Sequence, residues 1–397
     1  MTAPTGRASA SWKAPEPQEL PEWRARMLED INSEGSVHAL SRAIDAGHTA
    51  VFPVVSDAHA SPSMAAARLL ACAEESRLRE ARLYYATADM TSLTLAAAST
   101  SPMEPVREAR LPSPYGFMVF AEPIGGYVQN IADVLEGFTV RASSDMILTM
   151  PVVAVSWGPW APDEVDAVHW SKQSTCGRRE PITGNLRGVW ITFYTAAGSA
   201  FDALLPDTVI ATLPNGRHVT AADLQRAPRP VPLTWDGETT LAYGQTLHGL
   251  QQRTTDELSR TVYTAWQLIQ QTARTRAPLI KVDALVRDRA GRKRDRRDGI
   301  NGPSGVRVVD VHAAYRPRPE APGQGGQTAA SGDSPRWSRR WPVRPYRRNT
   351  CLNPRAHADN QCEHEESIVP AHVKGPAHLP LRAEGTVYLW NRQRDDG

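Results

Sequence analysis

Cysteine is scarce in this chain of 397 residues, and its few cysteines are far apart. The four are Cys72, Cys176, Cys351 and Cys362, too few for the dense disulfide framework of small secreted domains. A chain of this length can bury a core without such cross-links. We therefore expect a reduced, cytoplasmic protein.

Long apolar runs are lacking as well. The most apolar stretch, residues 146–160, is interrupted by two prolines and is shorter than the roughly 20 residues that cross a bilayer. The first 20 residues carry two basic side chains with no apolar stretch behind them, which argues against a secretory signal. We expect no membrane partner, and we interpret 146–160 as a buried strand.

The motifs of several common enzyme classes are missing. The sequence has no GxSxG nucleophile elbow, no Walker loop and no HExxH zinc motif. Its one glycine cluster, residues 323–326, does not lie between an expected strand and an expected helix. We favour a non-enzymatic protein and keep a metal-dependent hydrolase or nuclease as the alternative.

An acidic loop is one candidate site for that alternative. Asp163, Glu164, Asp166 and His169 lie close together, and Cys176 follows them. Paired carboxylates and a histidine can perform acid–base chemistry or hold a metal. A solvated acidic loop between two strands is the simpler interpretation, since loops are polar by default.

A Cys/His group near the C-terminus is the other candidate. Cys351, His357, Cys362 and His364 fall within fourteen residues and make a chemically adequate tetrahedral zinc set. A bound metal would also order a loop that has no apolar residues to pack. The spacing lacks the close cysteine pair of a zinc finger, so free thiols in a polar loop remain the simpler interpretation.

Lysine is nearly absent, because only 5 of the 45 basic residues are lysine. This skew, together with 32 prolines, resembles the product of a GC-rich genome, so arginine number alone is weak evidence for phosphate binding. The charge is nonetheless uneven. Residues 287–397 hold 21 Lys and Arg against 13 Asp and Glu, a net of +8, whereas the remainder has a net of −6. A basic end on an acidic body suggests an anionic partner.

Hydrophobic periodicity predicts an α+β fold. It comprises N-terminal helices, a central mixed or antiparallel sheet, a long helix and a small C-terminal antiparallel β-module. A capping box at Thr254 and Glu257 opens the long helix, whose face includes Leu258, Val262 and Trp266. Central strands are expected at 115–122, 146–157 and 188–195, and hairpin turns at the dipeptides 215–216 and 236–237.

Composition divides the chain into four parts. We expect a disordered tail at 1–21, an α/β body at 22–286, a basic linker at 287–304, and a basic β-module at 305–397 interrupted by disordered residues 317–335. The linker includes the run RDRAGRKRDRRDG and reads as a solvated arm. Within it we single out Arg292, Lys293 and Arg294 as partner-binding residues. The strand at 306–315 would be a fourth strand of the β-module.

The β-module begins with a segment in which cations and aromatics interleave. If it forms a strand, one face could pack while the other presents guanidinium groups to phosphate or to an acidic peptide. A strand with core tryptophans and merely solvated arginines is the alternative. The expected binding residues are Arg339, Arg340, Trp341, Arg344, Tyr346, Arg347 and Arg348.

Several short segments resemble a known family. RWSRRWPVRPYRR and SIVPAHVKGP at the C-terminal end, with GFMVFAEP, AVSWGPW and GVWITFYT in the middle, are similar to the type V anti-CRISPR family that suppresses biogenesis of its effector nuclease. They are also similar to actinobacterial and mobile-element proteins that share this ending. The resemblance covers most of 22–390, and the linker at 317–335 and the Cys/His loop depart from it. The known member of that family recognises a nascent polypeptide and lowers the level of its transcript. The resemblance therefore implies a regulator of expression, without naming its target.

The leading hypothesis is thus a regulatory binding protein that contacts RNA, DNA or a nascent polypeptide at the ribosome. Its basic C-terminal module would make the contact. A structural zinc ion at the Cys/His group is kept as the alternative to free thiols. A structural or assembly protein of a mobile element is a third hypothesis.

Overall fold

The computed structural model describes most of the chain up to residue 311 and four short strands beyond it. The described residues are 12–47, 49, 51–55, 61–100, 104–131, 141–142, 147–161, 168–173, 179–182, 187–202, 204–226, 233–247, 254–271, 279–311, 341–343, 346–351, 364–369 and 372–374.

An eight-stranded sheet forms the centre of the protein, in the order β12-β9-β6-β3-β2-β14-β13, with β4 also paired to β6. The pairs β14–β2 and β2–β3 are parallel and the others are antiparallel, so the sheet is mixed. This confirms the predicted α+β class. The strands are β2 (Arg82–Ala86), β3 (Gly116–Phe120), β4 (Gly125–Asn130), β6 (Ile147–Trp160), β9 (Gly188–Thr195), β12 (Thr234–Ala242), β13 (Ile280–Leu285) and β14 (Val306–Val311).

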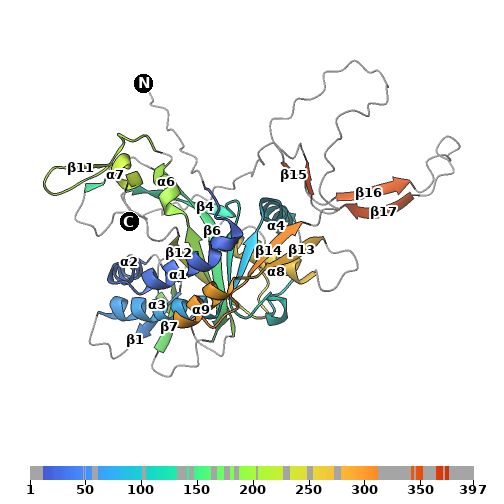
Figure 1. Ribbon diagram of the computed structural model, residues 1–397, viewed down its shortest axis with the longest axis horizontal. Coiled ribbons are helices and arrows are strands. Elements are labelled where there is room, and N and C mark those ends of the chain that lie inside the picture. The colour runs from blue at the N-terminus through green and yellow to red at the C-terminus, as the bar shows by residue number, and fades with distance from the viewer. Residues whose placement is uncertain are drawn as a thin grey trace, which may run out of the picture.

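Helices cover both faces of this sheet (Figure 1). Alternate residues of one strand enter different cores: Leu83 of β2 packs with α1 and α3, whereas Tyr84 packs with α4 and α8. The described helices are η1 (Pro17–Glu19), α1 (Leu20–Ile31), α2 (Glu34–Asp45), α3 (Pro62–Glu80), α4 (Ala88–Thr100), η2 (Glu108–Arg110), α6 (Ala197–Asp202), α7 (Ala221–Arg226), α8 (Thr254–Gln271) and α9 (Arg289–Arg297). Among the described residues, no helix is long and apolar enough to span a membrane.

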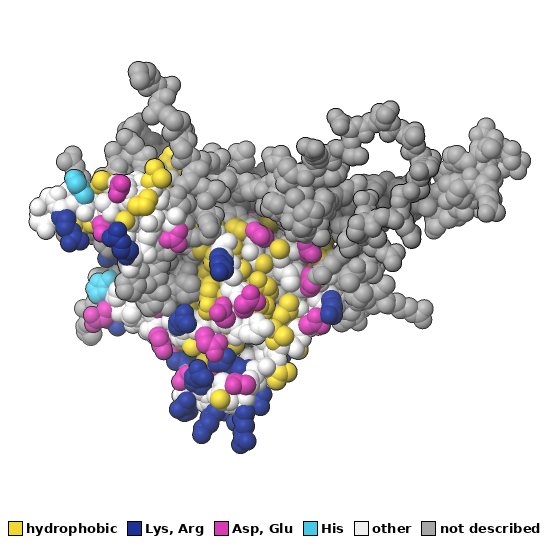
Figure 2. Space-filling view, turned by 45° about the horizontal axis from the view of Figure 1, so that its top comes forward, with side chains coloured by type: hydrophobic (Ala, Val, Ile, Leu, Met, Phe, Trp, Pro, Cys, Tyr) yellow, Lys and Arg dark blue, Asp and Glu magenta, His cyan; other side chains and the backbone are white. Residues whose placement is uncertain are grey.

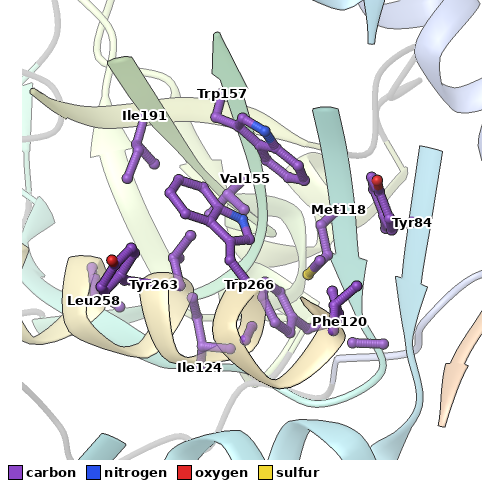
Figure 3. Close-up of a cluster of buried hydrophobic side chains, with 14 of the residues drawn as sticks. Tyr84, Met118, Phe120, Ile124, Val155, Trp157, Ile191, Leu258, Tyr263 and Trp266 are labelled. Atoms are coloured by element: carbon purple, nitrogen blue, oxygen red, sulfur yellow. The ribbon is translucent and has the colours of Figure 1, made fainter. Parts of the chain in front are cut away.

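The predicted long helix is α8, and its apolar face is buried as expected. Figure 3 shows Trp266 of α8 directed toward Trp157 of β6, with ring centroids 5.1 Å apart. The ring centroids of Tyr84 and the same Trp157 are 5.5 Å apart. Gly116 of β3 must be small, because an added Cβ would overlap that ring. Aromatic packing therefore joins the helix to the middle of the sheet.

Two smaller sheets flank the large one. One has the order β1-β7-β8 and the other β11-β10-β5. The turn predicted at Asn215 and Gly216 does join β10 to β11, and Gly216 has a φ of +82°. The strands are β1 (Val51–Val55), β5 (Arg141–Ala142), β7 (Val168–Gln173), β8 (Arg179–Pro181), β10 (Val209–Thr212) and β11 (His218–Thr220).

The hairpin turn predicted at Asp236 and Gly237 was wrong. Both residues lie inside β12, where the register against β9 shifts between Trp235 and Gly237, which is a β-bulge. Pairing with β9 continues on both sides of the bulge, so tertiary pairing overrides the local turn preference.

The chain ends differ from expectation in two places. Part of the expected tail is ordered: the indole of Trp12 donates to the Phe120 carbonyl at 3.1 Å, and Leu20 is fully buried. The strand expected to join the β-module is β14, which instead lies between β2 and β13 in the large sheet. Val306 and Val309 of β14 are buried there in the two cores on opposite faces of the large sheet.

The C-terminal strands form two small antiparallel pairs, β15–β18 and β16–β17. The pair β15–β18 lies beside α4. The expected disordered stretch 317–335 lies outside the described residues. The bounds are β15 (Trp341–Val343), β16 (Tyr346–Cys351), β17 (His364–Val369) and β18 (His372–Lys374).

Candidate nucleic-acid interface

The segment expected to be a solvated linker contains the helix α9, which connects β13 to β14. Asp288 caps this helix, because its side chain accepts a hydrogen bond from the Gly291 amide at 2.8 Å. The chain leaves the helix at Gly299, whose φ is +69°. The linker prediction failed because α9 has no apolar stripe: Gly291 and Asp295 form its buried side.

The exposed surface of α9 is almost wholly cationic. Its one acidic residue, Asp295, is only 2% exposed. Figure 2 shows Lys and Arg side chains gathered at the lower end of the molecule, the side on which Figure 1 places α9. Three of the residues are those singled out from the sequence. The six exposed cations of the helix are Arg289, Arg292, Lys293, Arg294, Arg296 and Arg297.

A buried ionic cluster attaches α9 to α1. The carboxylate of Asp295 lies 3.1 Å from Nε of Arg287, which makes the two residues an ion pair. The angle between these two atoms does not meet hydrogen-bond geometry. Arg287 also donates to Glu22 of α1 at 2.9 Å, and its side chain is 8% exposed. The acid of α9 is therefore turned inward and neutralised, which leaves the outer surface positive.

Arg24 of α1 is buried next to this cluster and donates to the Ala81 carbonyl at 2.9 Å. Burial lowers the pKa of Arg24 to about 10, Asp295 opposes that shift, and Arg287 adds to it. The guanidinium therefore stays charged at neutral pH. Arg24 and Arg287 therefore both interact electrostatically with the carboxylate of Asp295.

The segment that follows α9 is held against the C-terminal end of α3. The amides of Asn301 and Gly302 donate to the Arg79 carbonyl at 3.1 and 2.8 Å. The Asn301 side chain donates to Glu80 at 2.8 Å, and Arg79 in turn donates to the Asp298 carbonyl. Both ends of α9 are therefore fixed, and its cations form a preorganised surface rather than a flexible arm.

The arginine-rich C-terminal strand is separate from α9. Trp341 lies in β15, and Tyr346, Arg347 and Arg348 lie in β16; Figure 1 places β16 and β17 at the far side of the molecule from α9. In the register of this pair, Arg347 stands opposite Ile368. Of the other predicted binding residues, Arg339, Arg340 and Arg344 lie outside the described residues.

The predicted zinc set is only half within the described chain. Cys351 ends β16 and His364 begins β17, and the register places these two residues opposite each other. His357 and Cys362 lie between them, outside the described residues. Within the described chain, no group of three or more His, Cys, Asp or Glu residues is placed to hold a metal ion.

The acidic loop is almost wholly outside the described chain. Asp163, Glu164, Asp166 and Cys176 are not among the described residues. His169 lies in β7, opposite Val54 of β1. The structure therefore leaves the acid–base alternative as a prediction.

A buried polar cluster around Glu74 of α3 was missed at the sequence level. Glu74 is fully buried and accepts hydrogen bonds from Arg77 at 2.7 Å, from Thr192 at 2.8 Å, from Tyr194 at 2.6 Å and from Ser156. The guanidinium of Arg77 lies 5.0 Å from the centre of the Trp190 ring. The available signal was an acid and an arginine three residues apart on the apolar face of a helix.

The electrostatics of this cluster favour an ionised carboxylate. Burial raises the pKa of Glu74, but Arg77 and the three hydroxyl donors more than offset it and hold the pKa below its usual range. Burial and the neighbouring Glu74 together raise the pKa of Tyr194 well above its ordinary value. Since both oxygens of Glu74 are occupied by protein donors, the cluster joins α3 to β6 and β9 and is structural.

Comparisons of the chain with protein-family models, with curated proteins and with solved structures gave no match. The resemblance to the anti-CRISPR family therefore stays a prediction.

Proposed function

We propose that this chain is a regulatory protein that binds nucleic acid, with α9 as its main phosphate-contacting surface. The observation that carries the proposal is the set of six exposed cations on a nine-residue helix whose one acid is buried against Arg287. Phosphate groups are the partner that such a surface fits best, because arginine contacts phosphate oxygens through paired donors.

The arrangement of these charges argues against chance enrichment of arginine. Like charges three and four residues apart on a helix destabilise it by a few tenths of a kcal/mol per pair. Arg289, Arg292, Lys293 and Arg296 are related by such spacings. The fold holds them together with a cap, a buried ion pair and a clamped exit. A genomic bias toward arginine would favour none of these three features.

Binding to nucleic acid should depend steeply on salt. Each phosphate neutralised on duplex DNA releases counterions, and the logarithm of the affinity then falls with the logarithm of salt concentration by about 0.9 per contact. A surface that uses all the exposed cations of α9 would give a slope of about −5.

The test is fluorescence anisotropy of the full chain with labelled DNA and RNA oligonucleotides between low and physiological salt. The variant R292Q/K293Q/R294Q should bind at least tenfold more weakly and have a shallower salt slope. Glutamine keeps good helix propensity, so α9 should persist. The control R68Q/R217Q/R226Q removes three exposed cations outside α9 and should bind as the natural chain does.

Two results would contradict the proposal. One is equal loss of binding in both triple variants, which would indicate only a general charge effect. The other is binding of an acidic peptide in place of any oligonucleotide, which would favour a polypeptide partner.

The resemblance of 336–348 and 367–376 to the anti-CRISPR family supports the regulatory part of the proposal. In that case, the basic segment at 337–348 would be a second contact.

A further inference from the structure

The helix α9 stands out from the protein surface. Gly291 and Asp295, four residues apart, lie on one stripe of the helix and are its only buried members, and the other seven residues are exposed. Gly291 permits a close approach, because an added Cβ would lie 2.5 Å from Nε of Arg287. A helix attached along so narrow a stripe leaves most of its circumference accessible.

The cations are spread around that circumference. At about 100° per residue, Arg292 and Arg294 lie roughly 200° apart and therefore occupy opposite flanks of the helix. Lys293 lies between them, directly away from the buried stripe, and Arg289 and Arg296 lie close to it on the same outer side. A flat phosphate-binding patch would need charge on one side only, whereas α9 carries it on the outer side and on both flanks.

This distribution matches a groove with two charged walls. The major groove of B-form DNA is about 12 Å wide and admits an α-helix, with phosphates along both of its edges. The A-form major groove of duplex RNA is too deep and narrow for side chains to reach its bases. Single strands are usually held by aromatic stacking, and α9 has no aromatic residue.

We infer that α9 enters the major groove of B-form DNA. Arg292 and Arg294 contact the phosphates of the two strands, and the outer cations approach the base edges. Those outer side chains only donate hydrogen bonds, and the acceptor pair of guanine, O6 and N7, is their best match in the groove. This inference rests on the proposed function and names duplex DNA as the partner class.

The first experiment compares the full chain on three probes of one sequence: a 20-base-pair DNA duplex, the corresponding RNA duplex, and the DNA single strand. The DNA duplex should bind about tenfold more tightly than either of the others. Bound protein should also protect guanine N7 from dimethyl sulfate, because N7 opens into the major groove.

The outcomes separate the two proposals. If the affinity for the RNA duplex or for the DNA single strand equals the affinity for the DNA duplex, the groove inference is overturned. The proposal that the protein binds nucleic acid is then still intact. Tight DNA binding with every guanine N7 still reactive also overturns it, since contact would then be to phosphates alone. No binding to any of the three probes overturns the proposed function itself.

Paired variants test the assigned positions. R292Q/R294Q should weaken binding to all duplex sequences and reduce the salt slope by about 2. K293Q/R296Q should reduce the ratio of affinities between guanine-rich and guanine-poor duplexes at least several-fold. Circular dichroism and thermal unfolding establish that each variant is folded. If the two variants change the salt slope and the guanine preference by the same amounts, the division into flank contacts and outer contacts is contradicted.

Discussion

Asp295 of α9 and Arg287, which precedes the helix, form an ion pair of 3.1 Å in an almost fully buried position. The pair places the only acid of a basic helix on the inner side. It also extends to α1, since Arg287 donates to Glu22. The stability of the fold and the charge of its exposed surface therefore depend on the same contact.

Asp295→Asn should destabilise the protein by about 3 kcal/mol, because Arg287 and Arg24 would keep their charge in a buried site with one partner fewer. Urea unfolding monitored by tryptophan fluorescence measures this loss. Asp298→Asn, at an exposed position just after the helix, is the matched control and should change stability by less than about 0.5 kcal/mol. Equal effects in the two variants would show that the buried pair contributes nothing specific.

Glu74→Gln should cost about 3–5 kcal/mol at neutral pH, because Arg77 would lose its buried counter-charge. The folded-state pKa of Glu74 lies below its unfolded value, so its contribution is present above the unfolded pKa, about 4.3, and is lost as pH falls through the folded pKa. The variant should therefore lose less stability on acidification than the natural chain.

The measurement is the free energy of unfolding between pH 7 and pH 3. Glu29→Gln, at an exposed position on α1, should leave both stability and its pH dependence nearly unchanged. An unaltered pH profile in Glu74→Gln would mean that this carboxylate is not the group that makes the fold acid-sensitive.

Gly302→Ala should loosen the exit from α9. The added Cβ would lie 2.6 Å from the Glu80 carbonyl oxygen, which is backbone and cannot move aside cheaply. We expect a loss of about 1–3 kcal/mol. Gly35→Ala is the control: its nearest neighbour would be 4.0 Å away, and alanine in α2 should stabilise the helix by up to about 1 kcal/mol. Thermal unfolding of both variants should therefore shift in opposite directions.

Charge reversal in the C-terminal strand, Arg344→Glu with Arg347→Glu, should weaken nucleic-acid binding and flatten its salt dependence if this segment is a second contact. Fluorescence anisotropy titrations measure how much affinity for nucleic acid this variant loses. Comparison with the loss in the α9 variants shows whether the two segments contribute to affinity additively. Unchanged binding would remove the C-terminal strand from the interface.

The zinc expectation is tested on the purified full chain by elemental analysis. If the Cys/His group binds zinc, the natural chain should contain one zinc per chain, and the variant C351S/H364A should lose it, because these two residues stand opposite each other in β16 and β17. Zinc that remains in the variant, or a metal-free natural chain, would contradict it.

Some features followed from local pattern alone. Leu258, Val262 and Trp266 recur at helical spacing, and α8 formed where they predicted it. The strands β3, β6 and β9 were recognisable because each is a mostly apolar run, and in the structure almost every residue of these strands is buried. Three basic residues of α9, Arg292, Lys293 and Arg294, were also identified as candidates, since charge can be counted without knowing the fold.

The sequence by itself determined the fold class, the main helices and strands, and which segment is basic, because periodicity and charge are local properties. Only the tertiary structure decided that β14 lies beside β2, that Asp236 and Gly237 form a bulge, and that a charged linker is a helix. Each of these depends on a partner distant along the chain: β2 for β14, β9 for the bulge, and α1 for the buried Asp295–Arg287 pair. Glu74 became a structural ion-pair centre for the same reason, since its hydroxyl donors come from β6 and β9.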